Sequence, residues 1–386
     1  MDKNKRLTVW LPVIIAASIA LGIFIGNHYL SISQGKKRSY SSGNKINAIL
    51  DIIDEQYVDT VSMSKLVEST IPKIFSELDP HSVYIPAEDA SVVNEELEGS
   101  FSGIGVSFNM QTDTILVISV ISGGPAEKAG LLPFDRIISI NDSIFSGKKK
   151  NQGEIMKTLR GAKNSTVKLG VQRGNSPELL YFDVTRGDVP VNSVDVSFEA
   201  AKGIGYIKVS KFARNTYNEF ITAIAKLKQA GCTSFVIDLR GNTGGYMDAA
   251  INMINEFMPE GRLIVYTEGK SFPRSDVYAN GTGTCKDAPI VVLTDEISAS
   301  ASEIFSGAIQ DNDRGTIIGR RTYGKGLVQT QMSLSDGSEM RLTIARYYTP
   351  SGRCIQKKYE MGNTDAYDQD IYNRYMHGEF DSAASI

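Results

Sequence analysis

Histidine and cysteine are scarce, because the chain of 386 residues holds only three of each. The cysteines, Cys232, Cys285 and Cys354, are far apart and form no CxxC pair, which argues against a zinc ribbon and a thioredoxin-like redox site. The sequence leaves open whether two of the cysteines form a disulfide and the third is a free thiol. The net charge of −3 gives no reason to expect nucleic acid as a partner.

None of the three histidines lies within residues 190–358, where strand and helix patterns alternate. His28 lies beside an apolar N-terminal stretch, His81 follows a proline as a turn residue does, and His377 lies in a polar tail. A Ser-His-Asp triad is therefore disfavoured, and a catalytic serine in that segment would need a different base.

An uncharged stretch of 18 residues, Val9–Gly26, follows Lys3, Lys5 and Arg6. This length nearly spans a bilayer, and the basic residues before it favour retention of the N-terminus in the cytoplasm. A cleaved signal peptide is the alternative, but the bulky residues 27–30 offer no small-x-small cleavage site. The sequence therefore predicts a single-pass anchor in the cell membrane, with the rest of the chain on the exported side, periplasmic or extracytoplasmic.

The hydrophobic period changes along the chain, which predicts a multi-domain protein with α/β and β parts. Helix-like steps of three and four residues come first, with a break at Leu78–Ser82. Short strands and turns follow, and after Pro190 strand and helix alternate, which favours an α/β layer with crossover connections. Residues 332–348 alternate around a turn and predict a hairpin. The predicted parts are an anchor with its flank (1–35), a linker and helical domain (36–98), a β-rich module (99–187), an α/β core (188–358) and a polar tail expected to be irregular (359–386).

Three serines alternate in Ile297–Ile304, "ISASASEI", between an apolar strand-like run and a helical pattern. Ser300 and Glu303 fit the S-x-x-E capping box, so Ser300 is either a simple N-cap or more than that. Backbone N–H groups at a helix start also stabilise the negative charge that develops when a serine attacks a carbonyl. The same position therefore suits a nucleophile.

Lys325 is a candidate base for such a serine. It lies in "RTYGKGLVQ", where glycines allow close backbone approach and apolar neighbours could dry the amine. Keeping a lysine neutral near pH 7 to 8 lowers its pKa by about 3 units, at a cost of about 4 kcal/mol, which proteins accept chiefly where a base is needed. The same segment matches the phosphate-binding pattern GxxxxGK, but Gly326 replaces the required Ser or Thr and a strand pattern follows, so a nucleotide site is disfavoured.

Two glycine-rich turns offer backbone N–H groups. In Asp238–Gly245, "DLRGNTGG", the amides of Gly244 or Gly245 could bind an oxyanion, although an ordinary strand-to-helix turn explains the motif equally well. In Ser102–Val106, "SGIGV", a glycine turn beside a strand edge could receive the terminal carboxylate of a peptide, and a plain glycine bend is the alternative.

The motifs SGIGV, DLRGNTGG, ISASASEIFSGAIQDNDRG and GKGLVQ occur in this order. Together they resemble the carboxyl-terminal processing proteases, also called tail-specific proteases, over residues 44–358. The resemblance implies that Ser300 is the nucleophile, that Lys325 is the general base and that Gln329 orients the lysine. It also implies oxyanion donors from the backbone of Ala301 and of one glycine of DLRGNTGG.

By the same resemblance, the β-rich module is a PDZ domain that binds substrate C-termini. Arg160, in "LRGAKNS", resembles a PDZ arginine that helps to align the active site in some members. The residues that would bind the peptide end are Gly103, Ile104, Gly105 and Val106.

We therefore expect an exported serine endopeptidase that cleaves proteins near their C-termini through a Ser300–Lys325 dyad, without a metal or an organic cofactor. The uncharged Lys325 amine should lie within hydrogen-bonding reach of the Ser300 hydroxyl. Substrates should have disordered, apolar C-termini, because the PDZ groove takes an extended chain end. The sequence leaves open a homo-oligomer or an adaptor as a further partner. The alternative is a membrane-tethered peptide-binding scaffold with an inert protease-like domain, which would have no need of a desolvated lysine.

Overall fold

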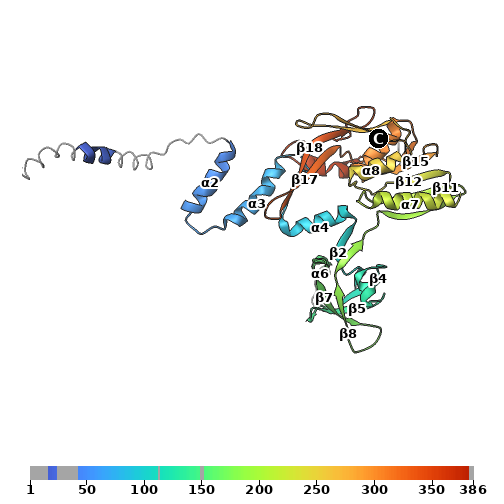
Figure 1. Cartoon of the computed structure of the whole chain (residues 1–386), viewed down its shortest axis with the longest axis horizontal. Coiled ribbons are helices and arrows are strands. Elements are labelled where there is room, and N and C mark those ends of the chain that lie inside the picture. The colour runs from blue at the N-terminus through green and yellow to red at the C-terminus, as the bar shows by residue number, and fades with distance from the viewer. Residues whose placement is uncertain (1–15, 24–41, 112–113, 148–151, 382–386) are drawn as a thin grey trace, which may run out of the picture. The chain divides into compact units, whose positions relative to one another are not determined.

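The structure, a computed structural model, describes residues 16–23, 42–111, 114–147 and 152–381 (Figure 1). The chain divides into two compact units, residues 1–70 and 71–386. In the first unit, residues 16–23 are helical and helix α2 spans Ser42–Gln56. Within the part of the chain that the structure describes, none of the helices combines the length and the apolar character needed to cross a bilayer. Of the predicted anchor Val9–Gly26, only residues 16–23 fall in this part, and the others lie outside the described residues.

Helices and a short strand precede the β-rich module. Helix α3 (Met63–Ser76) ends before Leu78–Ser82, so the predicted break is confirmed. Strand β1 (Val83–Ile85) follows, which the helical period did not predict. Helix α4 (Ala87–Glu98) comes next and ends at Gly99, whose φ of 74° is a left-handed conformation that suits glycine.

A six-stranded antiparallel sheet forms the predicted β-rich module. Its order is β3-β4-β5-β7-β8, with β6 beside β5, so β3 is an edge strand. Helices α5 and α6 pack with the sheet around a core that includes Val117, Ile137, Ile155 and Val184. A separate two-stranded ladder joins β2 to β9. The bounds are β2 Ser100–Gly103, β3 Val106–Gln111, β4 Thr114–Val120, α5 Pro125–Ala129, β5 Arg136–Ile140, β6 Ser143–Ile144, α6 Gln152–Leu159, β7 Thr166–Gln172, β8 Leu180–Thr185 and β9 Gly187–Pro190.

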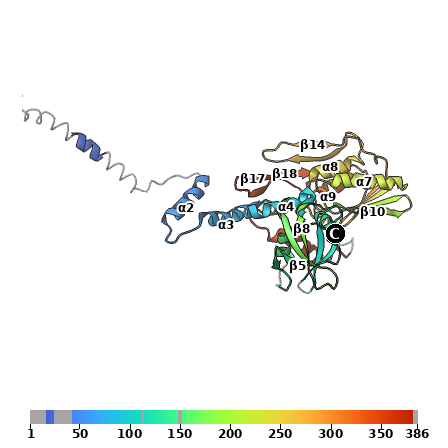
Figure 2. The same ribbon diagram turned by 60° about the horizontal axis from the view of Figure 1, so that its bottom comes forward.

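A five-stranded sheet, in the order β10-β11-β12-β15-β16, forms the predicted α/β layer. The last four strands are parallel, and β10 is antiparallel to β11. Because the parallel strands are added in one direction, right-handed crossovers place α7, α8 and α9 on one face, and α8 contacts both other helices (Figures 1 and 2). Their shared core includes Ile207, Phe235, Val292 and Phe305. The bounds are β10 Val194–Ala201, β11 Ile204–Val209, α7 Thr216–Gln229, β12 Ser234–Asp238, α8 Met247–Asn255, β15 Ile290–Thr294, α9 Ala301–Asp311 and β16 Thr316–Gly319.

A second sheet begins just after Lys325. Strand β18 pairs with β17, β1 and β13, and β13 also pairs with β14. The antiparallel pair β17 and β18 confirms the hairpin predicted for residues 332–348. Among the described strands β17 pairs only with β18, so its other edge stays open. The bounds are β13 Leu263–Glu268, β14 Ser275–Tyr278, β17 Leu327–Ser333 and β18 Glu339–Tyr348.

The C-terminal segment, residues 359–381, is folded, so the prediction of an irregular tail is wrong. It contains the short helices α10 (Asp365–Asp368) and α11 (Asp370–Met376). The segment is polar and has little apolar periodicity, and its order depends on buried polar contacts. Arg374 and Glu379 are both buried and form an ion pair at 2.8 Å.

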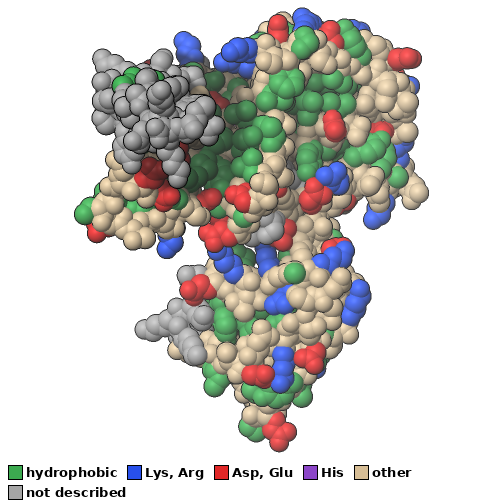
Figure 3. All heavy atoms as spheres, turned by 60° about the vertical axis from the view of Figure 1, so that its left-hand side comes forward, with side chains coloured by type: hydrophobic (Ala, Val, Ile, Leu, Met, Phe, Trp, Pro, Cys, Tyr) green, Lys and Arg blue, Asp and Glu red, His purple; other side chains and the backbone are tan. Residues whose placement is uncertain are grey.

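Charges of both signs are mixed at the surface. On the face drawn in Figure 3, Lys and Arg side chains lie among Asp and Glu side chains, with hydrophobic areas between them. Some form exposed ion pairs, such as Lys163 with Asp188 at 2.6 Å and Arg214 with Glu98 at 2.7 Å. Exposed pairs contribute little to stability, so the fold depends mainly on its hydrophobic cores.

Candidate active site

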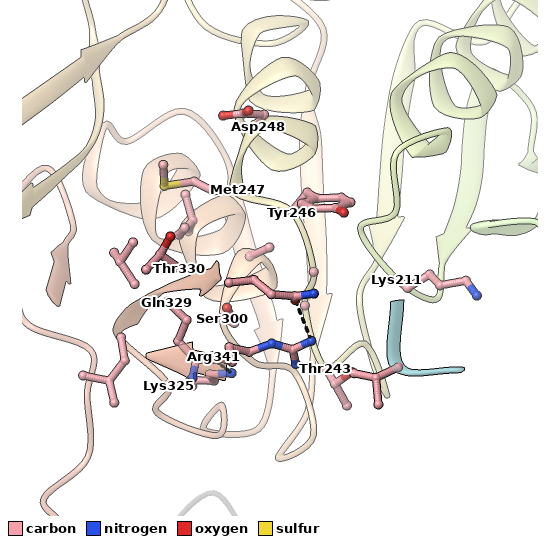
Figure 4. A pocket seen from close by; sticks show the side chains of 18 of the residues that line it. Lys211, Thr243, Tyr246, Met247, Asp248, Ser300, Lys325, Gln329, Thr330 and Arg341 are labelled. Atoms are coloured by element: carbon pink, nitrogen blue, oxygen red, sulfur yellow. Dashed lines mark hydrogen bonds between the residues drawn. The ribbon is translucent and has the colours of Figure 1, made fainter. Parts of the chain in front are cut away.

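The three serines of ISASASEI have different environments. Ser298 and Ser302 are buried, and their hydroxyls donate to backbone carbonyls of the DLRGNTGG loop, Ser298 to Leu239 at 2.8 Å and Ser302 to Asn242 at 2.9 Å. Ser300 is partly exposed and lines a cavity, and none of the described side chains forms a hydrogen bond with its hydroxyl (Figure 4). The outer serines therefore join two loops, and the middle serine is available for chemistry.

The backbone of Ser300 is strained. Its φ of 54° and ψ of −114°, at the N-cap of α9, lie where residues with a Cβ are rarely found. Gly244 packs against this turn so closely that a Cβ on it would lie 2.7 Å from Ser300 Cβ and 2.8 Å from the Ala299 carbonyl oxygen. Only glycine fits there. The glycine-rich loop and the serine turn are thus in backbone contact, which fixes the direction of the serine side chain.

Two backbone amides beside this turn are free to bind an oxyanion. Among the described residues, no acceptor bonds the N–H of Ala301 or the N–H of Gly245. The N–H of Gly244, in contrast, donates to Asn242 Oδ1 at 2.8 Å. A Cβ on Gly244 would lie 3.0 Å from Ala301 N, so the loop and the helix start are adjacent. Of the two candidate glycines, Gly245 therefore has the available donor.

The Lys325 side chain is partly buried, and a hydrogen bond orients its amine. Burial lowers its pKa, and the positive charge of Arg341 lowers that pKa further. Lys325 Nζ donates to Gln329 Oε1 at 3.1 Å, and Gln329 Nε2 donates to the backbone carbonyl of His81. Because a carbonyl can only accept, His81 fixes the orientation of the amide and turns Oε1 toward the lysine. One amine proton is thereby occupied, and a neutral amine keeps its lone pair for another proton.

Glu303 and Tyr347 join the backbone of Ser300 to that of Lys325. Glu303 Oε2 accepts the N–H of Ser300 and the N–H of Lys325, each at 2.8 Å. Oε1 accepts the Thr322 hydroxyl and the Gly324 N–H, each at 2.7 Å. Four donors favour the ionised carboxylate, whereas burial raises the pKa of Glu303. The buried Tyr347 hydroxyl contacts the carbonyl oxygens of Ser300, at 3.1 Å, and of Lys325.

Ser300 and Lys325 line one cavity of about 1130 Å³. Figure 4 shows them grouped with Gln329 and Arg341, and with Lys211 on the far side. No hydrogen bond joins Lys325 Nζ to the Ser300 hydroxyl, so the predicted direct contact is absent from this structure. The two groups nevertheless share one space that could hold an extended peptide.

Comparison with known proteins agrees with this geometry. Residues 203–365 match the model of peptidase family S41, and residues 102–195 match that of a PDZ domain. The chain is 33% identical over 365 residues to a probable CtpA-like serine protease of Staphylococcus aureus (strain N315), covering 92% of this chain and 72% of that protein. The chain belongs to peptidase family S41.

Further similarities of this S41 protease concern processing enzymes. It is 35% identical over 318 residues to the carboxy-terminal processing protease CtpB of Bacillus subtilis, over 82% of this chain and 66% of that protein. Among solved structures, the photosystem II D1 C-terminal processing protease is similar, with a TM-score of 0.46 and 28% identity over 82% of this chain and 91% of that chain. The predicted family is confirmed: the protein is a C-terminal processing serine protease with a PDZ domain, and the inert scaffold fits these findings less well.

The PDZ turn of the S41 protease joins β2 to β3 through Gly103–Val106. Ile104 is buried, and its carbonyl accepts the N–H of Ala126 at 2.7 Å. Gly105 has a φ of 78°, which favours glycine. The turn leads into the edge strand β3, which pairs only with β4 among the described strands.

Arg160 of the PDZ domain lies on the wall of the cavity that holds Ser300. Its guanidinium donates to Glu95 of α4 at 2.8 Å and lies 4.5 Å from the ring centre of Phe101. Arg160 therefore lines the same cavity as Ser300 and Lys325.

Sequence reasoning missed several residues of the site. Glu303 had a signal, the capping box, but its bonds to Thr322, Gly324 and Lys325 come from a loop about twenty residues later. His81 appeared only as a turn residue, and nothing local connected it with Gln329, 248 residues away. Tyr347 and Arg341 lie in a correctly predicted strand but carry no motif that marks them.

Proposed function

We propose that Ser300 is the nucleophile and Lys325 the general base of this S41 protease. The observation that carries the proposal is that one cavity is lined both by a serine whose hydroxyl no described side chain bonds and by a partly buried lysine amine of lowered pKa. Ser298 and Ser302 are occupied by backbone carbonyls, and a neutral lysine is a competent base.

The reaction follows from these groups. Lys325 Nζ takes the proton of the Ser300 hydroxyl as the oxygen attacks the peptide carbonyl carbon. The N–H groups of Ala301 and Gly245 stabilise the oxyanion, in a place where preorganised donors are most effective. The lysinium then gives its proton to the leaving amine as the C–N bond breaks, which leaves an acyl-enzyme. Water, deprotonated by Lys325, attacks the ester, and the serine oxygen regains a proton.

The Ser300 hydroxyl and the Lys325 amine form no hydrogen bond in the structure, so the proposed reaction needs them to come closer. Catalytic hydrogen bonds are commonly long before substrate binds and shorten in the complex. Gln329 keeps the amine oriented meanwhile, because its own amide is fixed by the His81 carbonyl. A peptide that displaces water from the cavity would also favour the neutral amine further.

Substrate recognition belongs to the PDZ domain in this proposal. The substrate C-terminus adds as a strand beside β3, with its carboxylate on the N–H groups of Gly103–Val106. Arg160, which lies on the cavity wall and on the PDZ domain alike, couples this binding to the active site. Cleavage kinetics of two unfolded peptides, identical except that one has a free and the other an amidated C-terminus, test whether the PDZ domain recognises the terminal carboxylate. We expect amidation to raise KM and leave kcat unchanged; equal KM values would contradict the PDZ role.

We also propose that Val9–Gly26 anchors the protein in the cell membrane and that the protease acts on the exported side. This proposal is based on the length of the uncharged stretch and on the basic residues that precede it. The test compares cells that express the full chain with cells that express the chain without residues 1–35. The amount of each protein that stays in the membrane fraction after a carbonate wash is measured, and only the full chain should stay there. Recovery of the full chain in the soluble fraction would contradict the anchor.

Cleavage of an unfolded protein substrate tests the dyad. Ser300→Ala and Lys325→Ala should each lose about 100-fold or more in kcat, because both remove a group that acts in the transition state. Lys202→Ala, at an exposed position between β10 and β11, is the matched control and should cleave normally. Wild-type rates in either dyad variant would contradict the assignment.

A further inference from the structure

The folded C-terminal segment is tied to the loop that carries Lys325. Glu379 accepts Arg374 Nε at 2.9 Å and Arg321 Nε at 3.0 Å. Arg374 Nη1 also donates to the Thr322 carbonyl at 3.2 Å. The residues bound in this way, Arg321 and Thr322, come just before Lys325 in the chain. The C-terminal segment therefore restrains the loop that leads to Lys325.

Tyr367 is the buried centre of this segment, with 4% of its surface exposed. Its hydroxyl lies 2.7 Å from His81 Nε2 and accepts Gln356 Nε2 at 3.2 Å. Either the Tyr367 hydroxyl or His81 Nε2 donates in this bond, depending on the tautomer of the imidazole. The Tyr367 ring meets the His81 ring edge to face, with 5.3 Å between centroids, and Lys357 Nζ lies 4.0 Å from the centre of the Tyr367 ring.

His81 connects Tyr367 to the catalytic amine. Its carbonyl accepts Gln329 Nε2, and Gln329 Oε1 accepts Lys325 Nζ at 3.1 Å. Burial, and then the charge of Lys325, lower the pKa of His81 to about 4, so the ring is neutral near pH 7 and forms a neutral hydrogen bond with the Tyr367 hydroxyl. Asp79 Oδ1 holds the backbone N–H of His81 at 3.0 Å. The His81 turn is therefore fixed from both its backbone and its ring.

We propose that Tyr367, acting through His81, is a positioning residue for the Gln329–Lys325 pair, and that the C-terminal segment is a working part of the active site. Tyr367 lies beyond residues 203–365, which match the peptidase family model. The proposal rests on the assignment of Lys325 as general base. Loss of the Tyr367 hydroxyl loosens the His81 turn, which lets the Gln329 amide rotate and leaves the lysine without a fixed acceptor.

The test compares Tyr367→Phe with Tyr372→Phe in the full chain. Both variants lose only a hydroxyl, but Tyr372 is 58% exposed on the same segment. Rates are divided by the number of sites that a serine-directed phosphonate titrates, so that they refer to folded enzyme. We expect Tyr367→Phe to lower kcat about five- to tenfold, the value of one lost hydrogen bond, with KM unchanged. Tyr372→Phe should match the wild type.

A double-mutant cycle separates positioning from a general structural role. If Tyr367 acts through Gln329, the loss caused by Tyr367→Phe should shrink to less than about twofold in a Gln329→Ala background. An equal loss in both backgrounds, or no loss in the wild-type background, would overturn the proposal. The Ser300→Ala variant, measured in parallel, distinguishes failure of the dyad from failure of the Tyr367 proposal. Cleavage at the wild-type rate by Ser300→Ala would refute the dyad. If Ser300→Ala is inactive and Tyr367→Phe cleaves at the wild-type rate, only the role of Tyr367 is refuted.

Discussion

Arg341 places its positive charge on the same cavity wall as Lys325 and lowers the pKa of the lysine amine, in addition to the larger effect of burial. Among the described residues, Arg341 forms no ion pair, and its guanidinium donates to the neutral amide of Gln331 at 3.2 Å. Its charge is therefore not cancelled by a carboxylate. A cation beside an amine disfavours the ammonium form, so Arg341 favours the neutral form of Lys325.

Replacing Arg341 by Gln should move the acid limb of kcat/KM to higher pH. In the proposed mechanism activity needs the neutral amine, so it should rise as pH passes through the pKa of Lys325, and removing the cation raises that pKa. Arg341→Lys keeps the charge and is the control, for which the limb should stay near that of the wild type. The pH profile of cleavage of a short peptide measures both. Superimposable profiles for wild type and Arg341→Gln would show that the charge has no such effect.

Glu303→Gln should impair both stability and catalysis. The amide would turn an NH2 group toward two of the four donors that the carboxylate accepts, and leaving buried donors unpaired costs about 2–4 kcal/mol. Because two of those donors are the backbone N–H groups of Ser300 and Lys325, kcat should fall as well. Denaturant unfolding and steady-state kinetics measure the two effects.

Glu256→Gln is the matched control for that change. Glu256 is also buried, with 5% of its surface exposed, and accepts the Tyr217 hydroxyl at 2.8 Å and the Thr284 N–H at 3.0 Å. It does not line the cavity of Ser300, so its variant should lose stability and keep kcat. A similar kcat for both variants would show that Glu303 only stabilises the fold.

Gly244→Ala should reduce kcat/KM about 100-fold, because a displacement of the nucleophile by about 1 Å is enough for such a loss. The new Cβ would lie 2.7 Å from Ser300 Cβ, and the turn must move. Gly241→Ala is the control in the same loop: its φ of 73° is also unfavourable for alanine, but the added Cβ meets no atom within 4 Å. It should lose about 1 kcal/mol of stability and keep activity. Equal activity in both variants would contradict the close approach.

Lys325→Met should stabilise the protein while it abolishes cleavage. The amine has a lowered pKa when folded, so the unfolded chain binds more protons between that pKa and the ordinary value of 10.5. Stability of the wild type therefore rises with pH through this window, and below it the buried amine is a cost. Methionine has no such cost. Unfolding midpoints from pH 6 to 10 should show a higher midpoint for the variant at pH 6 and a difference that shrinks as pH rises; a variant less stable at every pH would contradict this view of the amine.

Local periods in the sequence were enough to predict most of the fold. The alternation after Pro190 predicted the α/β layer, in which four strands are parallel. Strand β1 escaped detection because it has three residues and owes its structure to pairing with β18, more than 250 positions later. The C-terminal helices escaped because the buried Arg374 and Glu379 stabilise them through contacts with Arg321 and Thr322, which a local pattern does not contain.

The site was predictable where a motif carries its chemistry. Glycines and alternating serines marked Ser300 and Lys325 as candidates, and both line one cavity in the structure. The supporting residues were not, since a buried glutamate, a strand tyrosine and a turn histidine have ordinary local sequences. Even within a motif, the sequence could not tell which glycine amide is free, because the bond between the Gly244 N–H and Asn242 Oδ1 is known only from the structure.

The rate at which a serine-directed fluorophosphonate modifies Ser300, measured against pH, tests the central assignment most directly. Wild-type enzyme should react with a single apparent pKa below 10.5, and Lys325→Ala should react about 100-fold more slowly without that pKa. Mass spectrometry should find the adduct on Ser300 in the wild type. Modification of Ser300 at the wild-type rate and with the wild-type pH profile in Lys325→Ala would show that another group is the base.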